Sequence, residues 1–136
     1  MLQISLHMDP PDPTTRDAVL AIDDEPELLE FVRGCLEPAG FQVYTAMSAK
    51  EGVDFYEKNW RNIKLVLLDF LMPEMTGDLV FECLKRLNPE VRAILLTGCE
   101  DNVAQRMFQE GLFGYIHKPF HFQDFIQRVH EAVGTI

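Results

Sequence analysis

Short apolar runs alternate along the chain with longer segments in which apolar and polar residues mix. The runs lack the polar residue at every second position that marks a strand with one wet face. Continuous apolar strands are typical of a parallel sheet covered on both faces. The pattern predicts strands at 18–22, 41–46, 65–68, 91–96 and 113–117.

The mixed segments carry apolar residues at the three- and four-residue spacing of amphipathic helices. Helices are expected at 27–36, after Ser48, at 80–87, at 101–110 and from 122 onward. Ser48 and Glu51 have the spacing of a capping box, and Asn88-Pro89 ends the third helix. The second helix should bury Ala49, Val53, Tyr56 and Trp60. The last should bury Phe122, Phe125, Ile126, Val129 and Val133.

Five strands alternating with five helices predict a doubly wound α/β fold, because crossovers between parallel strands are right-handed. In such folds the ligand site lies beyond the carboxyl ends of the strands, where the strand order reverses. The 136 residues fit one domain, expected at 17–136. Residues 1–16 carry Asp9-Pro-Pro-Asp-Pro13 without periodicity and are expected to form a flexible lead-in.

Charge and composition indicate which kinds of partner and which compartment are expected. The net charge is -10, with 22 acidic and 12 basic residues and no basic cluster, so direct nucleic-acid binding by this chain is not expected. No apolar run has the length of a membrane span, and the N-terminus lacks a signal-peptide pattern. Cys35, Cys83 and Cys99 are widely spaced, which favours reduced core thiols in a cytoplasmic protein.

Polar residues follow the predicted strands where the site should lie. Asp23-Asp24-Glu25 follows the first strand, Asp69 the third, Thr97-Gly98 the fourth and Lys118-Pro119 the fifth. Neighbouring strands lie ~4.8 Å apart. Two carboxylates ~5 Å apart repel by roughly 3 kcal/mol at an effective dielectric of ~20. Such acids need a proton, an ammonium group or a metal ion, which points to Lys118 and to Mg²⁺.

Four ordered blocks carry a family resemblance. They are IDDEP at 22–26, LLDFLMPEMTG at 67–77, ILLTG at 94–98 and YIHKPF at 115–120. With them, the stretch from Asp17 to about Val133 resembles the CheY-like receiver domains of bacterial response regulators. The resemblance implies a flavodoxin-like sheet of order 2-1-3-4-5. It also implies a role in two-component or phosphorelay signal transduction.

The resemblance assigns roles to individual residues. Asp69 matches the phosphoacceptor, Lys118 the partner of the acceptor and then of the phosphoryl oxygens, and Thr97 the hydroxyl that turns towards the phosphoryl group. Tyr115 matches the aromatic switch, and Pro119 the cis-proline. For Mg²⁺, Asp24 matches the direct ligand, Asp23 acts largely through metal-bound water, Asp69 joins the set, and Leu71 lends its backbone carbonyl.

The implied function is a phosphorylation switch rather than an enzyme. A histidine kinase or phosphotransfer protein would donate the phosphoryl group, and the surface around the fourth helix and fifth strand would then change to control a partner or output domain. Apart from self-phosphorylation with Mg²⁺ and slow dephosphorylation, no catalysis is expected. Leu71 stands at the mouth of the site, and we hypothesise that it hinders an attacking water and lengthens the phosphorylated state.

Simpler interpretations stand beside these roles. Asp23-Asp24-Glu25 also suits a helix N-terminus, where acids favour the dipole. Thr97 also suits a strand end, Tyr115 an edge strand, and Lys118 a surface ion pair. Phe70, Met72 and Met75 suit either a partner surface or loop packing.

Two other functions are alternatives to a phosphorylation switch. A haloacid-dehalogenase-type phosphatase needs a second carboxylate two residues after the nucleophile, where this chain has Leu71. A receiver used as a scaffold without phosphorylation would keep the same pocket. No output domain is recognisable after the last helix, so a stand-alone regulator and a piece of a longer regulator or hybrid kinase both stay open.

Overall fold

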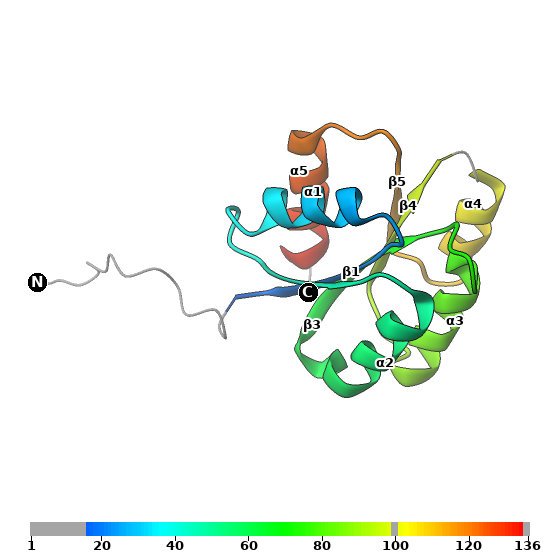
Figure 1. Cartoon of the computed structure of the whole chain (residues 1–136). Coiled ribbons are helices and arrows are strands. Elements are labelled where there is room, and N and C mark those ends of the chain that lie inside the picture. Colours follow the sequence, from blue (N-terminus) through cyan, green and yellow to red (C-terminus); the bar gives the residue numbers. More distant parts are fainter. Residues whose placement is uncertain (1–15, 99–100, 135–136) are drawn as a thin grey trace, which may run out of the picture.

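A computed structural model describes residues 16–98 and 101–134 of the chain. Five parallel strands form one sheet in the order β2-β1-β3-β4-β5, as expected (Figure 1). The strands are β1 (Ala18–Ile22), β2 (Gln42–Ala46), β3 (Ile63–Asp69), β4 (Ala93–Thr97) and β5 (Gly114–His117). The expected lead-in, apart from Arg16, and Cys99 lie outside the described residues.

The helices connect these strands in the expected alternation. They are α1 (Pro26–Leu36), α2 (Ala49–Asn59), α3 (Gly77–Leu87), α4 (Asp101–Gln109) and α5 (Phe122–Gly134), with a 3₁₀ turn, η3 (Trp60–Asn62), after α2. None of the described helices has both the length and the apolar character needed to cross a membrane.

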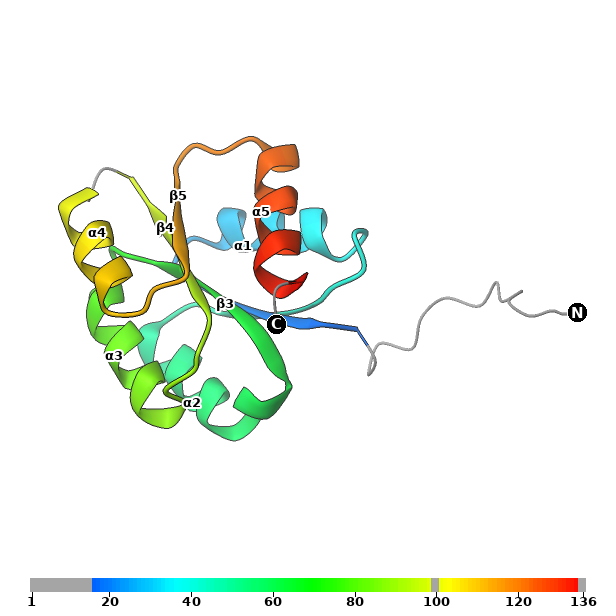
Figure 2. The same cartoon turned by 180° about the vertical axis from the view of Figure 1, so that it is seen from behind.

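Helices cover both faces of the sheet. Figures 1 and 2 show α1 and α5 on one face and α2 and α3 on the other, with α4 beside α3. Every residue of β1 and β4 is buried, because the strands are packed between two helical layers. Side chains on alternate positions therefore enter two separate cores. Leu20 and Leu68 pack with α2, α3 and α4, and Val19 and Leu67 pack with α1 and α5.

Helix starts follow their local sequence signals. Pro26 opens α1 in the first turn, where its missing N–H costs nothing. The Ser48 hydroxyl accepts from the Glu51 N–H at 3.1 Å, which confirms the predicted cap. The Glu51 carboxylate accepts from the Met47 N–H at 2.7 Å, one residue before the position that a standard capping box uses.

Two predicted helix stripes need correction. In α2 the buried positions are Ala49, Gly52 and Tyr56, whereas Val53 is only half-buried. Gly52 can pack directly on Ile22 because it has no side chain. A Cβ at this position would stand 2.5 Å from the Ile22 side chain. Trp60, expected in the α2 stripe, is half-buried in η3.

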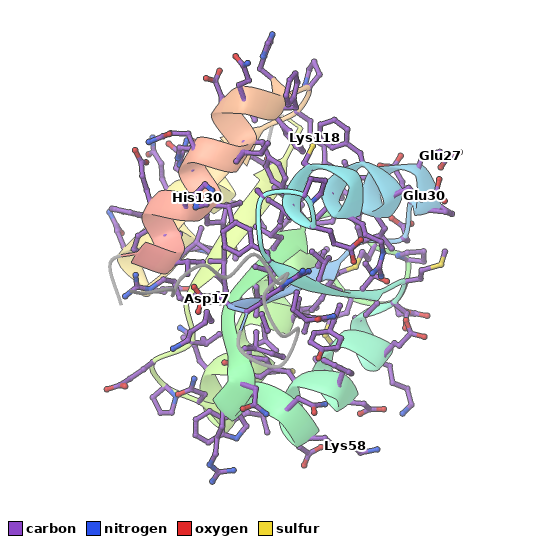
Figure 3. All side chains as sticks on the ribbon, turned by 90° about the vertical axis from the view of Figure 1, so that its left-hand side faces the viewer. Asp17, Glu27, Glu30, Lys58, Lys118 and His130 are labelled. Carbon is purple, nitrogen blue, oxygen red and sulfur yellow. The ribbon has the colours of Figure 1, made fainter. Side chains whose placement is uncertain are left out.

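In α5, Phe125, Val129 and Val133 are buried, and Ala132 joins them. Phe122 is wrong as a core residue, since 49% of it is exposed in the first turn of the helix, and Ile126 is half-buried. Figure 3 shows Glu27, Glu30 and Lys58 directed away from the sheet, which leaves the two cores free of their charges.

Candidate functional site

Three aspartates meet at the carboxyl edge of the sheet. Strands β1 and β3 are neighbours, with Ile22 opposite Leu68, so Asp23 and Asp69 leave the sheet side by side. One carboxylate oxygen from each of Asp23, Asp24 and Asp69 lies within 4.8 Å of the other two. Asp23 and Asp69 are buried, and Asp24 is half-buried. The order of the strands therefore brings together acids that lie far apart in the chain.

Lys118 supplies the cation of this cluster. Its Nζ donates to Asp69 Oδ1 at 2.9 Å and lies 3.6 Å from Asp23 Oδ2 and 3.8 Å from Glu25 Oε1. Lys118 follows β5, and its own N–H donates to the Thr97 carbonyl at 2.7 Å. The Lys118–Pro119 peptide bond is cis. The end of β5 thus holds the ammonium group over the ends of β1 and β3.

Asp23 is the most deeply buried acid, with 1% of its surface exposed. Its Oδ1 accepts from the Glu25 N–H at 2.8 Å. Among the described residues, Asp23 Oδ2 is buried without a hydrogen-bond partner. The pKa of Asp23 is raised to about 6, mainly by burial and in part by the charges of Asp69 and Glu25, against the lowering effects of the Glu25 N–H and Lys118.

The pKa of Asp69 is also raised, first by burial and then by the charge of Asp24, despite its hydrogen bond from Lys118. Burial alone would lower the pKa of the Lys118 ammonium. Its hydrogen bond to Asp69 and the charges of Asp69, Asp23 and Glu25 outweigh burial, so the pKa of Lys118 is raised instead. The cluster therefore contains more negative charge than its one ammonium group balances.

The cluster opens to solvent through a cavity of about 290 Å³. Its lining consists of Asp24, Glu25, Asp69, Leu71, Gly98 and Lys118. Leu71 is 63% exposed, and this places its side chain at the mouth of the cavity, where the sequence predicted it. Glu25 is a cavity residue to which sequence reasoning gave no separate role. Its position directly after the two aspartates was the available signal.

The segment after Asp69 packs closely against the sheet. The Gly77 N–H donates to the Phe70 carbonyl at 2.7 Å, and a Cβ on Gly77 would stand 2.6 Å from the Asp69 carbonyl oxygen. Met72 is buried, and Phe70 and Met75 pack against the core. These contacts favour loop packing over the alternative that the three side chains form a partner surface.

The two predicted switch residues lie on adjacent strands. Thr97 ends β4, fully buried, and pairs in register with His117 of the edge strand β5. Tyr115 is half-buried, two residues before His117, and its ring lies edge-on to the His117 ring at 5.8 Å. A second hollow, of about 890 Å³, lies along β5, where Tyr115, Phe108 and Phe113 contribute to its lining.

Comparison with known proteins agrees with this geometry. The model of the response regulator receiver domain family matches residues 19–130. Over 116 residues, 85% of this chain, the sequence is 31% identical to the cell cycle transcriptional regulator CtrA of Caulobacter vibrioides and 33% identical to the C4-dicarboxylate transport transcriptional regulatory protein DctD of Rhizobium meliloti. It covers 49% of CtrA and 25% of DctD, so it spans at most about half of these relatives.

Solved structures show the same fold. A receiver domain protein from Clostridium thermocellum superposes with a TM-score of 0.83 at 32% identity, over 88% of this chain and 95% of that chain. CheY in the CheX-CheY-BeF3-Mg+2 complex of Borrelia burgdorferi superposes with a TM-score of 0.81 at 25% identity, over 85% of this chain and 87% of that chain. Because the family model covers most of the chain and the fold and pocket agree with it, this chain belongs to the response regulator receiver domain family and works in two-component signalling.

Proposed function

We propose that Asp69 accepts a phosphoryl group from a phosphohistidine donor, with Mg²⁺ bound beside it. The observation that carries this proposal is the Asp69 carboxylate itself. It is buried at a strand end, bonded to Lys118 at 2.9 Å, and lines a cavity that opens to solvent. A carboxylate in this setting is a nucleophile that a phosphodonor can reach.

The donor set suits a hard divalent cation. Oxygen ligands from carboxylates are those that Mg²⁺ prefers, and three such oxygens lie within 4.8 Å of one another. The buried Asp23 Oδ2, which has no hydrogen-bond partner among the described residues, is supporting evidence. Asp23, Asp24, Asp69 and the Leu71 carbonyl would hold the ion. When bound, Mg²⁺ neutralises charge that develops on the transferring phosphoryl oxygens.

The chain's own residues carry the transfer. An Asp69 carboxylate oxygen attacks phosphorus, the bond from phosphorus to the donor nitrogen breaks, and an acyl phosphate forms on Asp69. Lys118 moves its hydrogen bond from the Asp69 carboxylate to a phosphoryl oxygen. Its raised pKa keeps the ammonium group charged for this role. Autodephosphorylation by water is slow in this proposal, because position 71, two residues after Asp69, carries leucine instead of a carboxylate that could act as general base.

The added phosphoryl group brings about -1.5 to -2 charges and three acceptor oxygens. We propose that Thr97 turns towards it and that Tyr115 on β5 follows. The surface formed by α4 and β5, which includes the 890 Å³ hollow, then changes its affinity for a downstream protein or output domain. A histidine kinase or phosphotransfer protein would be the donor. The cytoplasm is the proposed compartment, supported by the free thiols of Cys35 and Cys83.

Intact-mass measurement after incubation with acetyl phosphate tests this proposal. Wild-type protein with Mg²⁺ should gain the mass of one phosphoryl group, and protein with EDTA should not. Asp69→Asn should gain none, and Asp54→Asn on α2 is the matched control that should behave as wild type. No gain in the wild type would favour a scaffold, and steady release of inorganic phosphate over many turnovers would favour a phosphatase.

A further inference from the structure

A polar link joins the segment after Asp69 to helix α4. We propose that Thr76, Asp78 and Arg106, called here the α3–α4 clamp, restrain α4 while Asp69 is a free carboxylate and so oppose the phosphorylated state. The inference rests on the proposed function of Asp69. It adds a regulatory element that lies outside the acidic cavity.

Asp78 is the centre of the clamp. Its Oδ1 accepts from the Thr76 hydroxyl, and its Oδ2 lies 3.0 Å from Arg106 Nη2 of α4. Both carboxylate oxygens are therefore engaged, one by the loop before α3 and one by the neighbouring helix. The Asp78 side chain is 24% exposed and that of Arg106 is 54% exposed, so the pair lies at the surface but is not fully solvated.

The clamp is anchored to the proposed phosphoacceptor through backbone packing. Asp78 follows Gly77, whose missing Cβ allows the start of α3 to approach the Asp69 carbonyl, and the Gly77 N–H bonds to Phe70. A shift of the backbone at Asp69 or Phe70 must therefore move the first turn of α3. Asp78, in that turn, carries the shift to Arg106.

Helix α4 follows β4 at one end and is bonded to α3 near the other. Its start follows β4, which ends at Thr97. Towards its other end, Arg106 bonds to Asp78, and just beyond the helix the Glu110 carbonyl accepts from Lys85 of α3 at 3.0 Å. If Thr97 moves towards a phosphoryl group, it acts on the start of α4 while α3 holds the opposite end. The clamp therefore sets how readily α4 follows Thr97.

The size of the effect follows from the exposure of the ion pair, and its sign from the proposal that the pair restrains α4 while Asp69 is a free carboxylate. An exposed ion pair changes an equilibrium by about fivefold at most, and salt screens it. Removing the pair should favour the phosphorylated arrangement. Because apparent affinity scales with the fraction of molecules in the binding-competent state, a phosphoryl analogue should bind about two- to fivefold more tightly.

Titration calorimetry with beryllium fluoride in the presence of Mg²⁺ tests the clamp on the full chain. The variants are Asp78→Asn, Arg106→Gln and the double variant, compared at low and high salt. The matched control is the exposed Lys50–Asp54 pair of α2, at 2.7 Å, neutralised in the same way by Lys50→Gln and Asp54→Asn. Each single clamp variant should bind the analogue about two- to fivefold more tightly, and the gain should shrink at high salt.

The double variant decides whether the two residues act as one pair. If they do, its affinity equals that of a single variant instead of adding both gains. Unchanged or weaker affinity in the single variants, or an equal gain in the α2 control, overturns the clamp while leaving the proposed function intact. A wild type that binds no beryllium fluoride with Mg²⁺ overturns the proposed function and the clamp with it.

Discussion

Three carboxylates and one ammonium group lie close together at the carboxyl edge of the sheet. Lys118 contacts Asp69 directly and approaches Asp23 and Glu25, so one positive charge serves several acids. The excess negative charge destabilises the folded protein and at the same time creates affinity for a cation. Function at this site is therefore linked to stability, and the link can be measured residue by residue.

Asp23 should make stability depend on pH. Its pKa is about 6 in the folded protein and about 3.8 when unfolded, so the folded state holds the proton more tightly. The free energy of unfolding is therefore highest below pH 4, where Asp23 is protonated in both states. It falls as pH rises from 4 through 6, by up to about 3 kcal/mol. Without divalent cations, Asp23→Asn should therefore exceed wild type in free energy of unfolding at pH 7.

Urea unfolding at pH 4 and pH 7 in EDTA measures this difference. The gain of Asp23→Asn should be small at pH 4 and largest at pH 7, and added Mg²⁺ should stabilise the wild type more than the variant. Asp54→Asn on the exposed face of α2 is the control and should show no such pattern. A gain of the same size at both pH values would refute the role given to Asp23.

Leu71 should protect the acyl phosphate from water. Its exposed apolar side chain borders the cavity, so a polar replacement should admit and orient an attacking water. Loss of phosphate from Leu71→Asn should be about three- to tenfold faster than from wild type, equivalent to roughly 1 kcal/mol of barrier. Leu79→Asn is the control: it makes the same substitution at an exposed leucine of α3 and should leave the decay rate unchanged. Decay of Leu71→Asn no faster than wild type would refute the hypothesis.

Not every residue of the site could be predicted. Asp23, Asp24, Asp69 and Lys118 meet because each lies at the end of a strand or within two residues after it, and strand ends can be located in the sequence. The approach of Glu25 to Lys118 depends on the direction of two long side chains in loops, which no periodicity encodes. Whether Thr97 and Tyr115 act as a switch is a property of two states and stays a prediction.

At the scale of elements, α3 packs directly against the backbone of the site. It begins where the loop after Asp69 ends, and its first residue touches the Asp69 backbone. The close approach requires glycine at position 77 because any Cβ would overlap main-chain atoms that cannot rotate away.

Gly77→Ala should therefore destabilise the protein by about 1–3 kcal/mol, the usual cost of overpacking. It should also slow phosphorylation from acetyl phosphate, because relief of the overlap displaces Asp69. Gly34→Ala in α1 is the matched control. A Cβ there meets nothing within 4 Å, so the change should be neutral or stabilise by about 0.5–1 kcal/mol. Equal effects of the two substitutions on urea unfolding would contradict the close approach.

The elements themselves are largely predictable from apolar spacing, with shifts of one to three residues at their ends; the largest is the start of α3, predicted at residue 80 and observed at Gly77. The errors have physical causes. Phe122 matches the α5 stripe but occupies the first turn, which projects beyond the core. Gly52 escapes a prediction from apolar spacing because a glycine has no side chain to mark a buried position, although its backbone packs on Ile22.

At the scale of the molecule, the two helical layers bury both faces of the sheet, and the acidic cavity lies at its carboxyl edge. The strand order places β1 and β3 together at the centre, so the acids gather there, while the edge strand β5 brings Lys118 across from one side and Tyr115 to the outer surface. The alternation of strands and helices predicts a doubly wound sheet. The order of the strands came from the family resemblance, because spacing alone does not order strands.

The identity of the modified residue is the most direct test of the central claim. Protein phosphorylated by acetyl phosphate and Mg²⁺ is treated with borohydride, which reduces an acyl phosphate of aspartate to homoserine, and is then mapped by tandem mass spectrometry. Homoserine at position 69, absent without Mg²⁺, is the predicted result. Homoserine at another aspartate, or a phosphoryl group that survives as a stable ester on a hydroxyl side chain, would contradict the account.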